Sequence, residues 1–227
     1  MDGVNAQFRA LVVRVAKHFI RVHKLHGQIQ NLFPTTIFKT NDTTYVPMAN
    51  ELFSTVDWEK YKHKKYNKGG LTTYFNHSEP LPEVDEFDKF KQFITGAVHV
   101  LAREQGLDLS RYRASIEEIW LNSMHNGAIH ERHAHPGAHY SGTYYVNNPE
   151  GASRIKFYSP LQDLWGLAMP PIEEEDLNYI SAEWVQYDPV PGNLLIWNSW
   201  LYHEVLENKS ITENRNTISF NIVILEI

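Results

Sequence analysis

The chain has 227 residues, a length typical of one domain with room for a substantial core. It contains no cysteine, which excludes a disulfide framework, thiolate zinc sites, iron–sulfur ligation and a cysteine nucleophile. The formal net charge of −6 argues against a protein that coats nucleic acid, and the 12 histidines direct any metal chemistry toward nitrogen and oxygen ligands.

The start of the chain predicts one amphipathic helix over residues 6–26. Apolar residues recur there at three- and four-residue steps until Gly27. Residues 1–30 carry a formal charge of +4, against −10 for the remainder. A basic amphipathic helix can bind a membrane surface or an acidic partner, or it can pack on its own domain with a solvated basic face. We expect the second, and divide the chain into an N-terminal helix (1–30) and one domain (31–227).

Residues 31–115 give a weaker pattern than the rest of the domain. We predict a strand at residues 32–38, a turn at residues 68–70, and a helix over residues 84–105 that Gly106 ends.

From about residue 115 the sequence changes to short β-prone segments separated by turn residues. We predict strands at residues 118–124, 141–146, 154–158, 182–187, 194–198, 203–207 and 217–225. Because no helix separates them as a parallel crossover would require, the pattern favours an antiparallel sandwich or barrel. The expected fold is therefore mainly β with flanking helices (α+β), with its core at residues 115–227.

A histidine-rich run follows the first of these strands. His133 and His135 stand two residues apart, and on an extended chain both point to one face. His203 offers a third imidazole from a distant part of the chain. Three ligands on one face are the layout of a facial triad, which leaves sites open for substrate and dioxygen on iron. The alternative is an incidental histidine pair in a loop and a satisfied core histidine.

Twelve residues after His203 comes Arg215, with Thr217 two residues further on. In a barrel, that distance allows the chain to turn and to bring both residues back beside the metal. A guanidinium and a hydroxyl placed there could hold the distal carboxylate of a dicarboxylate cosubstrate. Arg215 by itself would be a surface arginine, but the order of the three features favours a metal site.

Several segments together carry a resemblance to a known family. They are Trp120-Leu121-Asn122, His133-Ala134-His135-Pro136, Ser141-Gly142-Thr143-Tyr144-Tyr145-Val146, the stretches 191–197 and 199–205, and Arg215-Asn216-Thr217-Ile218-Ser219-Phe220-Asn221. Residues 120–224 resemble the iron(II)- and 2-oxoglutarate-dependent oxygenases, and more narrowly a group of 2OG-Fe(II) oxygenases known from bacteria and marine phages. The likeness covers residues 31–115 only loosely and residues 1–30 not at all.

The resemblance implies a double-stranded β-helix (a jelly-roll or cupin-like barrel) with Fe(II) and 2-oxoglutarate as cofactors. His133 and His203 match metal ligands of the family, whereas His135 stands where the family has a carboxylate. Glu131 is the alternative carboxylate in another register. The residues expected to contact the cosubstrate are Arg215 and Thr217 at its distal carboxylate, and Asn122, Tyr144 and Asn221 elsewhere; His130 and His139 are expected behind the ligands or at the surface.

The resemblance also implies a dioxygenase that hydroxylates its substrate and releases succinate and CO₂. We expect a small-molecule or peptidyl substrate, dioxygen as a second substrate, neither a membrane nor nucleic acid as a partner, and a location in the cytoplasm of a bacterium or phage-infected host. A homodimer stays open. The substrate's identity depends on loops around the site, for which residues 41–80 and 160–180 are candidates.

Two alternative functions remain open at this point. One is a three-histidine cupin-type dioxygenase that uses no 2-oxoglutarate, in which Arg215 binds a carboxylate of the substrate itself. The other is a non-catalytic β-sandwich that binds a carbohydrate or a protein through aromatic residues such as Trp165 and Trp200.

Overall fold

The computed structural model describes residues 28, 30–61, 67–74, 81, 84–164, 173, 177–178 and 180–227. The chain divides into two compact units, residues 1–34 and residues 35–227. The helix predicted at residues 6–26 lies outside the described residues, so it stays a prediction, and the fold below is that of the second unit.

One antiparallel sheet forms the body of this unit. Its strands follow the spatial order β1-β7-β4-β9-β3-β8-β5-β6, and β2 pairs with β3 beside this path. The strands are β1 (Ile37–Asn41), β2 (Asn67–Thr72), β3 (Tyr112–His133), β4 (Tyr140–Tyr145), β5 (Ile155–Tyr158), β6 (Trp184–Tyr187), β7 (Asn193–Asn198), β8 (His203–Val205) and β9 (Arg215–Glu226).

The sheet curls into two layers because β3 is long enough to belong to both. Its residues 112–124 pair with β9, which continues the layer of β4, β7 and β1. Its residues 130–133 pair with β8, which continues the layer of β5 and β6. This arrangement confirms the predicted double-stranded β-helix.

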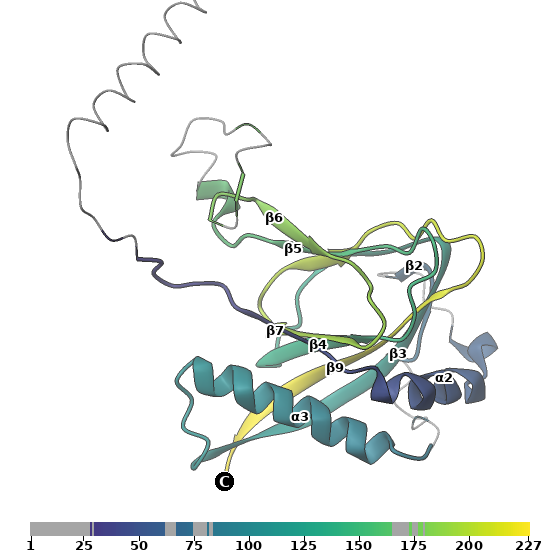
Figure 1. Ribbon diagram of the computed structural model, residues 1–227, viewed down its shortest axis with the longest axis horizontal. Coiled ribbons are helices and arrows are strands. Elements are labelled where there is room, and N and C mark those ends of the chain that lie inside the picture. Colours follow the sequence, from purple (N-terminus) through teal and green to yellow (C-terminus); the bar gives the residue numbers. More distant parts are fainter. Residues whose placement is uncertain are drawn as a thin grey trace, which may run out of the picture. The chain divides into compact units, whose positions relative to one another are not determined.

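Two helices cover the outer face of the first layer. They are α2 (Val46–Thr55) and α3 (Phe87–Glu104). The short 3₁₀ turn η1 (Thr43–Tyr45) precedes α2, and the 3₁₀ turn η2 (Trp58–Lys60) follows it. Figure 1 shows α2 and α3 lying across β3, β4 and β9 on one side of the barrel. Apolar side chains of both helices, such as Leu52 and Phe90, join Tyr144, Ile218 and Phe220 of the strands in the main core.

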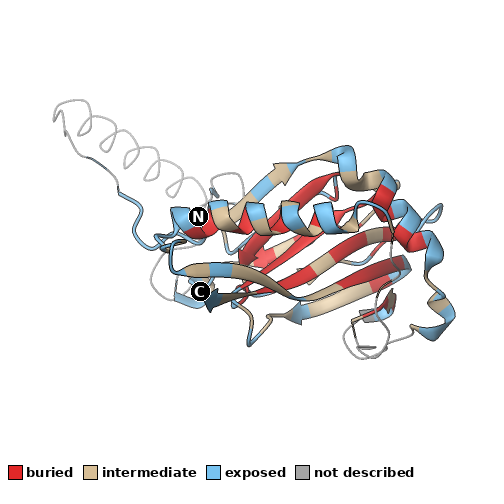
Figure 2. Cartoon of the chain, turned by 90° about the horizontal axis from the view of Figure 1, so that it is seen from below, coloured by how far each residue is buried: buried red, intermediate tan, exposed pale blue. Residues whose placement is uncertain are grey.

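Alternation along each strand divides the side chains between this core and the barrel interior. In β9, Ile218, Phe220 and Ile222 face the helices, whereas Thr217 and Ser219 face inward. The buried stripes of the strands stand out in Figure 2. A second apolar cluster packs inside the barrel and is formed by Tyr145, Ile155, Phe157, Leu195, Trp197 and Leu201.

Most predicted elements agree with the structure to within a few residues. The helix predicted at residues 84–105 is α3, and the strands predicted after residue 140 correspond to β4–β9. The strand predicted at residues 118–124 is the middle of the much longer β3. The strand predicted at 32–38 begins only at Ile37 and runs to Asn41. Helix α2 was not predicted.

The turn predicted at residues 68–70 is wrong, because these residues belong to β2. The strand carries a register shift between Lys68 and Gly70, and Gly69 adopts a positive φ of 71°. A glycine in this conformation produces a bulge that bends a strand without ending it.

None of the described helices is long and apolar enough to cross a membrane.

Candidate active site

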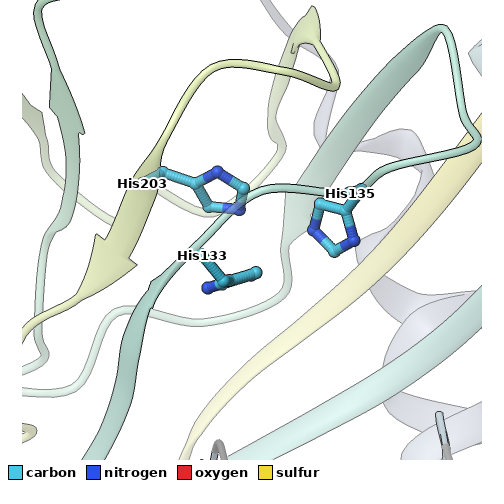
Figure 3. A group of neighbouring side chains, drawn as sticks. All are labelled: His133, His135 and His203. Carbon is cyan, nitrogen blue, oxygen red and sulfur yellow. The ribbon is translucent and has the colours of Figure 1, made fainter.

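Three histidine side chains converge inside the barrel. His133 ends β3, His135 lies two residues further on in the loop toward β4, and His203 begins β8. One ring nitrogen of each lies within 4.8 Å of the other two, and Figure 3 shows the rings turned toward one another. Since His133 is paired directly with His203 across β3 and β8, the sheet itself fixes the spacing of two of the three.

Backbone carbonyls hold two of the rings in the tautomer that metal binding requires. Nδ1 of His133 lies 2.7 Å from the carbonyl oxygen of Glu131, and Nδ1 of His203 lies 2.9 Å from that of Leu201. Because a carbonyl oxygen can only accept, each Nδ1 carries the proton and donates it. The lone pair of Nε2 is then free to bind a metal ion.

His135 is positioned in a different way. Its ring makes no hydrogen bond with any described residue, and its ring centroid lies 5.8 Å from that of Trp120. Its backbone N–H donates to the carbonyl oxygen of Ser199 at 2.9 Å. The loop backbone and the packing of the indole therefore place this third imidazole.

Burial keeps the three imidazoles neutral at physiological pH. It lowers the pKa of His133, lowers the pKa of His203 well below its usual value, and lowers the pKa of His135 to about 4. For His135 and His203, repulsion from His133 in its protonated form lowers the pKa further. A neutral ring keeps its lone pair, so a metal ion competes with few protons for it.

The histidines share one cavity with the predicted cosubstrate residues. The walls of this cavity include Asn122, Arg215 and Thr217 together with the three histidines. In the paired strands β3 and β9, Asn122 stands opposite Thr217, and Met124 stands opposite Arg215. These inward-facing positions bring together side chains that are more than 90 residues apart in sequence.

Arg215 is buried to 98% and has no carboxylate partner among the described residues. Its Nε donates to the carbonyl oxygen of Ser153 at 2.9 Å, and one terminal nitrogen lies 3.7 Å from the sulfur of Met124. Its guanidinium lies 5.2 Å from the ring centroid of Tyr145. Buried charges in proteins are normally paired, so the site offers an uncompensated positive charge to an anion in the cavity.

Two buried hydroxyl groups near Arg215, the phenol of Tyr145 and the hydroxyl of Ser153, meet the geometry of a hydrogen bond with none of the described residues. The phenol of Tyr145 is nevertheless close enough to Arg215 for each to influence the pKa of the other. Buried polar groups of this kind normally have a partner, so both hydroxyls are available to a ligand in the site. Neither residue was predicted from the sequence to contact the cosubstrate. Tyr145 directly follows Tyr144, for which that contact was predicted.

Two predicted cosubstrate contacts do not lie in the cavity. Tyr144 is on the opposite face of β4, where its hydroxyl donates to the carbonyl oxygen of Asp42 at 2.7 Å and its ring packs against Phe90. Asn221 faces the barrel interior, but its amide is bonded to Ser141 and Glu118 beyond the wall of the cavity. The predicted contact is thus not available to either side chain in this structure.

The other polar residues of the histidine-rich run also have defined places. The Glu131 carboxylate forms an exposed ion pair with Lys68 and is not part of the histidine group, which removes the support for Glu131 as a ligand. His130 lines the cavity and stacks on His133 with centroids 4.0 Å apart. Nδ1 of His139 accepts from the N–H of Ile224 at 3.1 Å.

Comparison with known proteins agrees with this fold. Residues 118–221 match a family model described as "Putative 2OG-Fe(II) oxygenase". A search of curated proteins finds no match.

Three solved structures are similar in fold. They are a prolyl-4-hydroxylase from Pseudomonas putida (TM-score 0.54, 15% identity, 85% of this chain and 94% of that chain), a viral collagen prolyl hydroxylase from Paramecium bursaria Chlorella virus-1 in complex with 2-oxoglutarate (0.51, 13%, 82% and 94%), and HygX from Streptomyces hygroscopicus with nickel and 2-oxoglutarate bound (0.51, 9%, 83% and 83%).

The fold is thus shared with these solved structures. In this chain, the histidine group and Arg215 line a single cavity. Residues 118–221, which include the three histidines and Arg215, are thus similar to the family of 2OG-Fe(II) oxygenases.

Proposed function

We propose that the protein hydroxylates a C–H bond of a small-molecule or peptidyl substrate, and that His133, His135 and His203 hold its iron. When bound, Fe(II) and 2-oxoglutarate supply the oxidative chemistry, in which one oxygen atom of O₂ ends in succinate, the other in the hydroxylated product, and CO₂ is released. The protein's own residues hold these groups, orient them and limit access of water.

The donor set fits a divalent transition metal. Imidazole nitrogen suits iron, nickel, copper and zinc. One nitrogen of each ring lies within 4.8 Å of the other two, so small rotations of the side chains would allow all three to bind one ion. Since none of the three ligands is charged, we expect the carboxylate of 2-oxoglutarate to supply the negative charge that the protein does not.

The observation that carries the proposal is the buried guanidinium of Arg215 without a carboxylate partner, in the same cavity as the three histidines. A dianion that reaches from the metal to Arg215 would compensate this charge, with the distal carboxylate accepting hydrogen bonds from the planar guanidinium. Thr217 and Asn122 line the space between and offer further donors.

The hydroxyl of Tyr145 supports the same assignment. It is buried beside Arg215 and meets hydrogen-bond geometry with none of the described residues, so a carboxylate placed there would satisfy it. Burial raises the pKa of Tyr145 to about 12, against the opposing influence of Arg215, so the phenol stays protonated and can donate.

Aromatic rings enclose the metal site on several sides. Trp120 packs against His135, and Trp197 and Phe157 pack against His203, with centroids 4.8 Å and 5.8 Å from its ring. These rings keep the imidazoles in place and exclude water, which strengthens the electrostatic attraction between Arg215 and an anion.

The test is a measurement of 2-oxoglutarate turnover without added substrate. The full chain, loaded anaerobically with Fe(II) and then exposed to air, is expected to form succinate and CO₂ only when 2-oxoglutarate is present, with added ascorbate as the two-electron reductant that reduces the second oxygen atom to water in place of a substrate. His133→Ala and His203→Ala should each abolish succinate formation. No succinate from the wild type, or succinate formation that survives both substitutions, would contradict the proposal.

A further inference from the structure

A chain of hydrogen bonds runs behind the wall of the cavity and ends at the loop that carries His135. The carboxylate of Glu118 accepts from the side-chain amide of Asn221 at 2.6 Å. The amide oxygen of Asn221 accepts from the hydroxyl of Ser141 at 2.8 Å, and the oxygens of Ser141 and Ser199 lie 2.9 Å apart. Asn221, Ser141 and Ser199 are each at least 97% buried.

The direction of every bond in this chain is fixed by chemistry. An amide oxygen can only accept, so the single proton of Ser141 goes to Asn221. Ser199 must then donate its own proton to Ser141, and the NH₂ group of Asn221 donates to Glu118. The chain therefore runs one way, from Ser199 to a carboxylate, which is the arrangement in which each bond strengthens the next.

Ser199 connects this chain to the metal site through its backbone. Its carbonyl oxygen accepts from the N–H of His135 at 2.9 Å, and its own N–H donates to the carbonyl oxygen of His139 at 3.0 Å. Both ends of the loop from His135 to His139 are thus bonded to Ser199. His135 depends on this support more than its two neighbours do, because carbonyl groups hold the rings of His133 and His203 directly, whereas its own ring has no such bond.

We propose that Asn221 is a positioning residue for His135, acting through Ser141 and Ser199, an inference that rests on the proposed metal site. An asparagine suits this place because one end of its amide donates to Glu118 while the other accepts from Ser141. The sequence analysis predicted that Asn221 contacts the cosubstrate. In the structure Asn221 does not line the cavity, so its proposed role is to support a metal ligand.

The test compares the metal affinity of two variants that each remove one buried asparagine. Asn221→Ala removes the hydrogen bonds from Asn221 to Glu118 and Ser141. Asn193→Ala is the matched control, because Asn193 is 96% buried in the same sheet but its side chain bonds Asn41 and not Ser141 or Ser199. The Kd for Co(II), a spectroscopic stand-in for Fe(II), is measured by its visible absorption, and the melting temperature of the metal-free protein is measured in parallel.

We expect Asn221→Ala to raise the Kd for Co(II) roughly 10- to 100-fold, the usual effect of removing a residue that orients a metal ligand. Asn193→Ala should lower the melting temperature but leave the Kd and the Co(II) spectrum unchanged. If both variants lose stability alike and keep the wild-type affinity, the role of Asn221 is structural and the inference is overturned. Should Asn221→Ala fail to fold, Ser199→Ala, which keeps the carbonyl that holds His135, replaces it with the same expectation.

A double-mutant cycle separates an effect through His135 from a general one. In a His135→Ala background, Asn221→Ala should change the Kd no further than about twofold, the limit expected for additivity errors. A full additional loss would contradict the inference. If instead the wild-type protein binds no Co(II), or binds it equally after His133→Ala, the proposed metal centre itself fails, a result distinguishable from failure of the role of Asn221 alone.

Discussion

Arg215 is the residue whose environment says most about the cosubstrate, because its guanidinium is buried without a carboxylate partner among the described residues. A charged side chain buried without a counter-ion is costly, and proteins retain one where a ligand supplies the opposite charge. Arg215 is held by one backbone carbonyl and a thioether contact, so at least part of its hydrogen-bonding capacity remains for an anion. The positive charge is thus in place before the cosubstrate arrives.

Replacing Arg215 with Gln should weaken the binding of 2-oxoglutarate roughly 100-fold, because hydrogen bonds to charged groups contribute about 1.5–3 kcal/mol each. The Kd for Co(II) should stay unchanged. Binding is measured calorimetrically with Co(II) present. Pyruvate, which has no distal carboxylate, should bind the wild type and R215Q equally, and the exposed Arg154→Gln serves as the matched arginine control. Equal affinity of wild type and R215Q for 2-oxoglutarate would contradict the anchor.

Tyr145→Phe should have opposite effects on stability and binding. The hydroxyl is buried and forms no well-aligned hydrogen bond with any described residue, so its removal is expected to raise the free energy of unfolding of the ligand-free protein by about 1 kcal/mol. The same change should raise the Kd for 2-oxoglutarate, since a donor to the carboxylate is lost. Chemical denaturation and calorimetry measure the two effects, and a variant that is less stable yet binds normally would remove Tyr145 from the site.

At the scale of the elements, alternation along β4 and β9 decides which side chains reach the cavity. In β9, Arg215 and Thr217 share the inward face, as their two-residue spacing predicted. In β4, the inward positions are Ser141, Thr143 and Tyr145, and a difference of one residue sends Tyr144 to the helix side. A sequence with two adjacent tyrosines does not reveal which one faces inward, because the register depends on pairing with β7 and β9.

Gly142→Ala should destabilise the barrel without changing any ligand. A Cβ at position 142 would overlap the ring of Phe220 and lie 2.7 Å from the carbonyl oxygen of Leu195, which cannot move aside. We expect a loss of about 1–3 kcal/mol in the free energy of unfolding. The matched control is Gly96→Ala in α3, where nothing lies within 4 Å and a gain of roughly 0.5–1 kcal/mol is expected. Urea denaturation distinguishes the two, and equal effects would show that the packing around Gly142 is misjudged.

Local patterns in the sequence were sufficient to predict the main strands and the histidine group of the cavity. The strands after residue 140 and the group formed by His133, His135 and His203 follow from spacing and alternation. The bulge at Gly69 and the length of β3 did not, because both depend on pairing between distant strands. The series of hydrogen bonds that connects Glu118 to Ser199 could not be predicted either, since the residues that form it come from β3, β9, β4 and the loop after β7.

At the scale of the whole molecule, the three histidines connect two layers of the barrel. His133 and His203 belong to the paired ends of β3 and β8, and His135 belongs to the loop that returns to β4. A ligand that binds only the folded state stabilises it by mass action, by about 2.7 kcal/mol at a free concentration 100 times the Kd. Metal loading should therefore raise the melting temperature, and a chelator should reverse the increase.

The metal-free protein should lose stability as the pH falls from about 6.5 toward 4. Burial lowers the pKa of His135 to about 4 from the ordinary value of 6.5, so between these values the unfolded chain binds more protons than the folded one. The contribution is complete above pH 6.5 and is lost on acidification. Denaturation at several pH values in EDTA measures it, and the slope in this range should become shallower in His135→Asn. An identical slope in both proteins would contradict the assignment.

The central claim is that three imidazoles hold one metal ion at one end of a cavity whose other charged group is Arg215. A crystal structure of the protein with Ni(II) and 2-oxoglutarate, grown without oxygen, tests it most directly. The account predicts one ion bound by Nε2 of His133 and His203 and by a ring nitrogen of His135, with the distal carboxylate of 2-oxoglutarate hydrogen-bonded to Arg215. An ion bound elsewhere, or a 2-oxoglutarate that makes no contact with Arg215, would contradict it.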